Sequence, residues 1–322
     1  MMYPTSEEGR ASREIYFSFC PSFLPQILLR EFFMFKNRSS LVLRIFATTI
    51  ALSVVGLTPT SAANSKPQRI ISLSPSATET LFAIGAGPQV IAVDDLSNFP
   101  TNAPISKLSA FSSNVEALLN YRPDLIILNA DATKAIEVKA ALEKLKIKVF
   151  LEKAPKDLSQ VYLEITALGR ATGNLTSAQT VVTTMKSKIR AAIKSGRQAK
   201  KISFFHELDN TLYTATSDTF IGKVYKDFNL TNVADPAASA DSAGYPQLQS
   251  EYLIKSNPRI IFLSDAQYGE SLATLMKRPG WNGISAVSKK SVIALPEDIP
   301  SRWGPRLVDF YEFIAAAIGK IK

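Results

Sequence analysis

The feature that most constrains the fold is an internal repeat with a constant offset of 135 residues, from Asn114 to Gln249. Residues 114–128 read Asn-Val-Glu-Ala-Leu-Leu-Asn-Tyr-Arg-Pro-Asp-Leu-Ile-Ile-Leu, and residues 249–263 read Gln-Ser-Glu-Tyr-Leu-Ile-Lys-Ser-Asn-Pro-Arg-Ile-Ile-Phe-Leu. Each copy predicts a short helix that ends at a proline. A continuous apolar run follows, which is typical of a strand buried on both faces.

The neighbouring segments repeat as well, with slightly drifting offsets. Residues 69–73 correspond to 201–205, and residues 148–151 correspond to 291–294. Helical stretches separate these strands, and strands that alternate with helices form parallel sheets with crossover helices. The sequence therefore predicts two α/β lobes of similar build, at about 66–155 and 200–322.

A helical connector is predicted between the lobes, at 157–198. Its apolar residues recur at helical spacing, and Gly173-Asn174 interrupts the pattern. The stretch 175–198 is long and contains no proline, so we expect one long helix that joins the lobes. A stiff helix permits less hinge motion than a flexible linker.

The N-terminal residues have the pattern of a leader. Residues 45–57 form a run of 13 uncharged residues after Lys36, Arg38 and Arg44, and Ser61-Ala62-Ala63 follows. A basic segment, a short apolar run and small residues at the exit are typical of a secretory signal. We assign 1–63 to the leader, with the signal at 34–63; an uncleaved anchor helix is the alternative.

Residues 1–33 precede the basic segment, and secretory signals usually begin only a few residues before it. We expect Met34 to be the true start and 1–33 to be a mis-assigned extension; an unusually long basic segment is the alternative. The single cysteine, Cys20, lies in the leader, so no lipidation cysteine stands near the cleavage site. The exported protein is then periplasmic, on the cell surface or extracellular.

Composition excludes several classes of chemistry. One His and one Cys cannot build a His/Cys zinc site or a disulfide framework, and a serine triad would have to use His206. Gly85-Ala86-Gly87 lacks the third glycine of a dinucleotide fingerprint. The net charge of +9 is compatible with nucleic-acid binding, but the lysines are dispersed along helices. We expect no metal, no cofactor other than the ligand, and no nucleic-acid partner.

Two groups of residues are candidates for ligand binding, because ligands of open α/β sheets bind at the carboxyl ends of strands. Ser74, Pro75 and Ser76 follow the first strand and open a helix, where hydroxyl and N–H groups either cap the helix or hold an anion. Aromatic residues in predicted loops suit a large, flat ligand, although each one alone is also explained by ordinary packing. They are Phe111, Tyr213, Tyr245, Tyr268 and Trp303.

Glu116 and Glu251 occupy the same position in the two copies of the repeat. One explanation is local: Ser113-x-x-Glu116 reads as a capping box, and Glu251 lies in the first helical turn after Ser250. The other is functional. Two related lobes present two related carboxylates, which suit docking onto a two-fold symmetric partner with basic sockets.

The motifs resemble those of one transport family. Arg69-Ile-Ile-Ser-Leu-Ser-Pro-Ser-Ala-Thr-Glu-Thr-Leu81 and Tyr121-Arg-Pro-Asp-Leu-Ile-Ile127 are similar to the substrate-binding proteins of ABC importers for metal chelates. Residues 245–251, 278–281 and 301–306 add to a resemblance that covers 66–318 and is strongest to the cobalamin-binding branch. It implies two Rossmann-like lobes with parallel sheets, joined by one long backbone helix.

The resemblance also implies a function and a site. The protein would capture a cobalamin-like corrinoid in the cleft between the lobes and deliver it to an ABC permease dimer with its ATPase subunits, docking on the permease through Glu116 and Glu251. A ferric siderophore or haem is the alternative ligand, because Phe111 and Tyr245 stand where that branch has tryptophans. We expect a monomeric binding protein and no enzyme; a hydrolase using His206-Glu207 and a cleft hydroxyl is the remote alternative. The expected ligand-binding residues are Ser74, Pro75, Ser76, Phe111, Ser112, Tyr213, Tyr245, Arg302 and Trp303.

Overall fold

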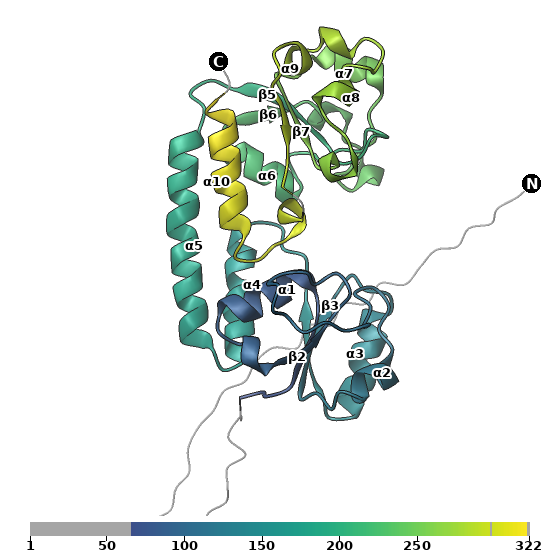
Figure 1. Cartoon of the computed structure of the whole chain (residues 1–322), viewed down its shortest axis with the longest axis vertical. Coiled ribbons are helices and arrows are strands. Elements are labelled where there is room, and N and C mark those ends of the chain that lie inside the picture. The colour runs from purple at the N-terminus through teal and green to yellow at the C-terminus, as the bar shows by residue number, and fades with distance from the viewer. Residues whose placement is uncertain (1–65, 297, 321–322) are drawn as a thin grey trace, which may run out of the picture. The chain divides into compact units, whose positions relative to one another are not determined.

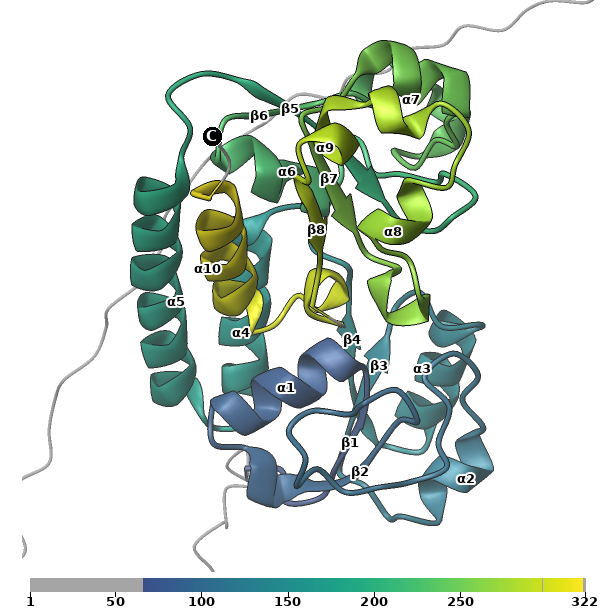
Figure 2. The same ribbon diagram turned by 45° about the horizontal axis from the view of Figure 1, so that its top comes forward.

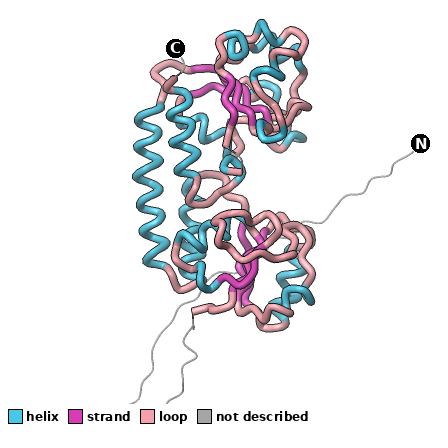
Figure 3. Tube along the Cα trace, viewed as in Figure 1, coloured by secondary structure: helices cyan, strands magenta, loops and turns pink. Residues whose placement is uncertain are grey.

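A computed structural model of the chain describes residues 66–296 and 298–320, and these contain two parallel sheets of four strands each. The first sheet has the order β2-β1-β3-β4 and the second has the order β6-β5-β7-β8. Figure 3 shows the strands in two separate groups. The strands are β1 Ile70–Leu73, β2 Val90–Val93, β3 Leu125–Asn129, β4 Lys148–Glu152, β5 Ile202–Glu207, β6 Leu230–Asn232, β7 Ile260–Leu263 and β8 Val292–Ala294.

The two sheets confirm the fold class that the repeat predicted. The repeated apolar runs form β3 and β7, which are inner strands at equivalent positions in the two sheets. All four residues of β7 are buried, and so are the first four of β3. A strand between two neighbours and under helices on both faces has no solvent-facing side, which explains the absence of polar alternation.

The helices cover the sheets and join the lobes (Figure 1). The α-helices are α1 Pro75–Ala83, α2 Val115–Leu119, α3 Ala135–Lys144, α4 Leu158–Ala171, α5 Leu175–Gly196, α6 Phe220–Asp227, α7 Ser250–Ser256, α8 Leu272–Leu275, α9 Ser285–Ser288 and α10 Leu307–Ile318.

Helix α5 is the expected long connector. It has 22 residues and is therefore about 33 Å long. It packs against α4, which precedes it, and against α10, which brings the end of the chain back to the connector (Figures 1 and 2). Met185 and Ile189 of α5 belong to a buried cluster that also contains Ile70 of β1 and Phe204 of β5. One apolar core thus runs through both lobes and the connector.

Two local expectations need correction. Ser113 does not cap α2: the cap is Asn114, whose side-chain oxygen accepts from the Ala117 N–H at 3.2 Å. The strand expected at 201–205 continues to Glu207, so His206 lies inside β5 and not after it.

The leader, the signal peptide and the start at Met34 fall on residues outside those described. Within the described ranges, no helix has the length and apolar character needed to cross a membrane.

Candidate functional site

A cavity of about 370 Å³ lies at the carboxyl ends of the strands of the second sheet. Ser264 is the first residue after β7, and Pro296 is the second residue after β8. Tyr245 and Trp303, both predicted from the sequence, are part of the lining. The complete lining is Leu208, Phe220, Ile221, Tyr245, Ser264, Gln267, Tyr268, Pro296, Asp298, Pro300, Ser301 and Trp303.

One wall of this cavity is a segment that crosses between the lobes, residues 298–306, which we call the interlobe strap. The strap leaves β8 of the second lobe, contacts α1 of the first and leads into α10. The backbone N–H of Trp303 donates to Ser76 Oγ at 3.1 Å. The Asn98 side-chain amide, from the first lobe, donates to the Asp298 carboxylate.

The strongest contact of the strap joins Arg306 to Glu79 of α1. The guanidinium donates two hydrogen bonds to this carboxylate, one from Nε to Oε2 at 2.9 Å and one from Nη2 to Oε1. The Glu79 residue is only 3% exposed. A buried, bidentate pair of this kind is both strong and geometrically specific. It therefore fixes where the strap lies on the first lobe.

Close packing accompanies this ion pair. A Cβ atom at Gly304 would lie 3.2 Å from the Ser76 carbonyl oxygen, so only glycine allows the strap to approach α1 this closely without adjustment. The Arg306 guanidinium also lies over the Phe99 ring, 4.2 Å from its centre. Arg302 is 3.8 Å from Glu79 and 3.4 Å from Asp298. This arginine, predicted as a ligand contact, faces carboxylates of the protein itself.

The three residues predicted as ligand contacts at the N-terminus of α1 make contacts within the protein itself. Ser74 caps the helix and accepts from the Ala77 N–H, Pro75 is the first helical residue, and Ser76 accepts from Trp303 as described. Both serines are buried. The structure thus brings Ser76 and Trp303 together and places the α1 terminus under the strap.

Only Tyr245 and Trp303 of the nine predicted ligand-binding residues line the cavity; besides the α1 N-terminus and Arg302, three more lie outside it. Phe111 and Tyr213 expose 60% and 43% of their surface, and Ser112 is exposed beside its bridge partner Thr133. Tyr213 pairs with Gln247 in an isolated antiparallel bridge, which brings its loop against the loop of Tyr245. Phe111 and Ser112 belong to the first lobe, on the loop before α2.

Sequence reasoning missed Ser264, Gln267 and Asp298 as lining residues. The rule that sites form at the carboxyl ends of strands pointed to the region after β7, and Ser264 is the first residue there. Nothing in the local sequence marks Asp298, because its role depends on a strap that reaches the other lobe. Tyr268, noted as a loop aromatic, lines the cavity and is 84% exposed.

His206 lies behind the cavity wall and is fully buried. Its Nδ1 is 2.9 Å from the Tyr225 hydroxyl and its Nε2 is 3.1 Å from Ser264 Oγ. Burial lowers the pKa of this imidazole to about 3, so the ring is neutral. Both ring nitrogens are engaged and neither reaches solvent, so this histidine supports Ser264 and is not placed to act as a base on a substrate.

An acidic cluster lies beside His206. Glu207 forms a bidentate pair with Arg278, at 2.7 and 2.6 Å, and Glu270 contacts the same guanidinium at 2.9 Å. Burial raises the pKa of Glu207 to about 7 and the pKa of Asp265 to about 6. Among the described residues, no group of His, Cys, Asp and Glu has the arrangement of a metal site.

Glu116 and Glu251 stand in the first turns of α2 and α7, the helices that precede β3 and β7. Both residues are exposed, and neither carboxylate forms an ion pair with another described residue. Each lies near a helix N-terminus, where a negative charge is favourable. The two carboxylates thus occupy equivalent, exposed positions in the two lobes.

Comparison with known proteins gives consistent relatives. A profile of the family described as periplasmic binding protein matches residues 70–299. The uncharacterized ABC transporter substrate-binding lipoprotein YvrC of Bacillus subtilis is 30% identical, over 79% of this chain and 80% of the relative. The vitamin B12-binding protein of Vibrio cholerae is 27% identical, over 84% of this chain and 95% of the relative.

A solved structure agrees with these sequence relatives. A protein from Staphylococcus epidermidis, described as a possible iron-binding (periplasmic solute-binding) protein, has a TM-score of 0.69 and 27% identity. The match covers 79% of this chain and 100% of the other. The proteins found by sequence and by structure are thus named for binding and not for catalysis.

Removing the Arg306 charge tests the interlobe contact. Arg306→Gln removes both hydrogen bonds from the guanidinium to the buried Glu79 carboxylate and leaves only Arg302, at 3.8 Å, so we expect the free energy of unfolding to fall by about 3 kcal/mol. Urea denaturation measures this change. Arg190→Gln, at an exposed position of α5, is the control and should change stability by less than about 0.5 kcal/mol. Equal effects of the two variants would contradict the assignment.

Glu152 predicts a pH dependence of stability. This residue ends β4, and burial, with a smaller contribution from nearby Glu164, raises its pKa to about 8 from 4.5. At a pH between 4.5 and about 8, the Glu152 carboxyl group is ionised in the unfolded chain and protonated in the folded protein. The free energy of unfolding therefore falls as pH rises, by at most about 1.4 kcal/mol per pH unit from this group.

The variant Glu152→Gln removes the titrating group and should flatten this slope. Urea denaturation at several pH values between 5 and 8 measures it, with Glu137→Gln at an exposed position as the control. A slope that is the same in Glu152→Gln and in the wild type would show that Glu152 is already ionised in the folded protein.

Proposed function

The chain belongs to the periplasmic binding protein family, and we propose that, as the substrate-binding protein of an ABC transporter, it captures a cobalamin-like corrinoid. The coarser role follows from the family and its relatives: it is an exported binding protein, not an enzyme, for a ligand of the cobalamin, siderophore or haem type. Such proteins work with a permease and an ATPase. The ligand itself is the part that we propose.

The observation that carries the corrinoid proposal is the chemistry of the cavity lining. Tyr245, Tyr268 and Trp303 provide aromatic surface for a flat ring, while Ser264 and Gln267 provide hydroxyl and amide groups. A corrin ring carries neutral carboxamides at its edge, and these exchange hydrogen bonds with such groups. The V. cholerae relative is named for vitamin B12 binding, which supports the same ligand.

The charge of the lining supports a corrinoid over haem. Haem carries two propionates, which basic side chains neutralise, whereas no Lys, Arg or His is among the described residues that line this cavity. Arg302, the nearest candidate on the strap, faces Glu79 and Asp298. The lining thus suits a ligand whose edge is neutral.

Iron binding is the second candidate, because the S. epidermidis neighbour is described as a possible iron-binding protein. A tyrosine phenolate can ligate iron. Burial raises the pKa of Tyr245, which disfavours the phenolate at this position. Tyr268 is the more exposed of the two tyrosines, so it would be the better oxygen ligand for an iron chelate.

Delivery requires docking to the permease, which we assign to Glu116 and Glu251. The support is their equivalence in the two lobes, their exposure and the lack of an ion-pair partner among the described residues. Carboxylates at the rim of an interface contribute mainly to orientation and to the rate of association. One carboxylate per lobe would set the orientation of the protein on a permease dimer.

Isothermal titration with cyanocobalamin, haemin and a ferric siderophore tests the ligand. We expect saturable heat with cyanocobalamin. Tyr245→Ala should weaken this binding by about fivefold to tenfold, because an aromatic contact contributes about 1 kcal/mol beyond buried area. Leu163→Ala, at an exposed apolar side chain on α4, is the control and should bind as the wild type does. No heat with cyanocobalamin, together with clear binding of haemin or the siderophore, would refute the corrinoid.

Charge reversal tests the docking role. Glu116→Lys combined with Glu251→Lys should abolish ligand uptake through the cognate permease and leave ligand affinity unchanged. Glu137→Lys combined with Asp309→Lys is the matched control, since these acids also lie in first turns of helices and are exposed. Unchanged uptake in the first double variant would remove the docking role, and lost ligand affinity would make the glutamates cleft or folding residues.

A further inference from the structure

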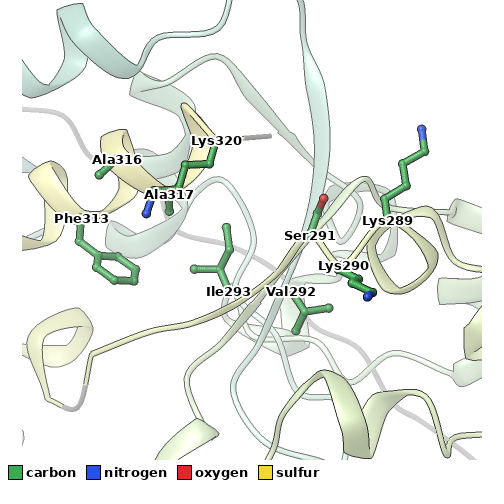
Figure 4. Close-up of a pocket in the computed structure, with 9 residues that line it drawn as sticks. All are labelled: Lys289, Lys290, Ser291, Val292, Ile293, Phe313, Ala316, Ala317 and Lys320. Atoms are coloured by element: carbon green, nitrogen blue, oxygen red, sulfur yellow. The ribbon is translucent and has the colours of Figure 1, made fainter. Parts of the chain in front are cut away.

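A second cavity lies on the C-terminal lobe and shares no lining residue with the cavity that Tyr245 and Trp303 line, which we call the first cavity. Its volume is about 810 Å³, compared with about 370 Å³ for the first cavity. It runs along β8 and the end of α10 (Figure 4), and we call it the β8–α10 groove. Strand β8 is an edge strand, because it pairs only with β7.

The inside of the groove is apolar. Phe313, Ala316 and Ala317 line it from α10, where the spacing of three and four residues puts them on one face of the helix. Ile293 lines it from β8, and Figure 4 shows that its side chain and the Phe313 ring face the same space. Alanine at two positions of this face leaves room that larger side chains would fill.

The charged residues of the groove are all cations. Lys289 and Lys290 lie in the turn between α9 and β8, and Lys320 follows the last turn of α10. All three are exposed, and none forms an ion pair with another described residue. No acidic residue is part of the described lining. The groove therefore combines apolar surface with unneutralised positive charge.

The other lobe offers a comparison, because the repeat places a similar hollow beside its own edge strand, β4. That hollow is about 370 Å³ and is lined by Lys66, Lys148 and Arg170 together with apolar residues. Lysines beside an edge strand can serve to prevent edge-to-edge pairing, and cations suit the ends of helices. Those roles account for the charges but not for an apolar hollow of about 810 Å³ at β8.

We propose that the β8–α10 groove binds a single-chain anionic amphiphile, such as a long-chain carboxylate. Its head group lies at the lysines and its chain lies against Phe313 and Ile293. Charge complementarity selects the anion, and the apolar lining selects the chain. An extended acidic peptide is a poorer fit, because β8 offers only three residues for strand pairing. A flat membrane surface does not fill a hollow.

Isothermal titration with sodium laurate, below its micelle concentration, tests this site on the full chain. We expect saturable binding with one site and a weaker affinity at high salt, since exposed charges are screened. Lys289→Gln, Lys290→Gln and Lys320→Gln together should weaken binding roughly tenfold. Lys107→Gln, Lys144→Gln and Lys188→Gln, at exposed positions elsewhere, remove the same charge and should leave laurate affinity unchanged.

A second variant fills the groove without changing charge. Ala316→Trp, at an exposed position, should abolish laurate binding while leaving the urea unfolding transition and the binding of cyanocobalamin unchanged. The neutral amphiphile dodecyl maltoside should bind at least tenfold more weakly than laurate.

Several results would overturn the proposal. They are absence of saturable laurate binding, equal affinity in the groove variants and the wild type, and tighter binding of an acidic, valine-rich peptide that displaces laurate. Groove-dependent binding to phosphatidylglycerol vesicles without binding of monomeric laurate would assign the groove to a membrane surface instead. Because the two cavities share no residue, loss of cyanocobalamin binding and loss of laurate binding are distinguishable failures.

Discussion

The buried ion pair between Glu79 and Arg306 is the contact on which the arrangement of the site depends. One partner comes from the first lobe and the other from the last segment of the chain before α10, so the pair closes the protein across its two halves. Glu79 is only 3% exposed, and burying a carboxylate lowers the free energy of unfolding unless a cation pairs with it. The interlobe strap therefore stays on α1, and its residues Asp298, Ser301 and Trp303 become a fixed wall of the cavity.

The connector reinforces this constraint. Helix α5 packs on α4 and α10, and one apolar core extends from β1 to β5 through these helices. Two lobes with separate cores and a loose linker would move independently. Here the long helix, the shared core and the strap favour small adjustments around a ligand over wide opening.

Much of the fold could be predicted from the sequence because it depends on local pattern. The apolar runs of β3 and β7, the helix–proline–strand repeat and the uninterrupted helical period of α5 each carry their own signal. The cap of α2 was misplaced by one residue because Ser113 and Asn114 are both good capping residues, and the pattern alone does not separate them. The extra length of β5 depends on pairing with β7, which local sequence does not show.

The site was predictable only in part, because its geometry depends on contacts between distant residues. Tyr245 and Trp303 are predicted as loop aromatics, yet nothing near Arg302 in the sequence indicates that Glu79, more than 200 residues earlier in the chain, lies beside it. Likewise Ser264 becomes a cavity residue through its position after β7, and His206 becomes its buried support.

The most direct test of the corrinoid assignment is the visible spectrum and mass of the ligand that copurifies with the protein from its native source. The account predicts a corrinoid spectrum and a cobalt-containing mass; a haem Soret band or a ferric siderophore charge-transfer band would contradict it.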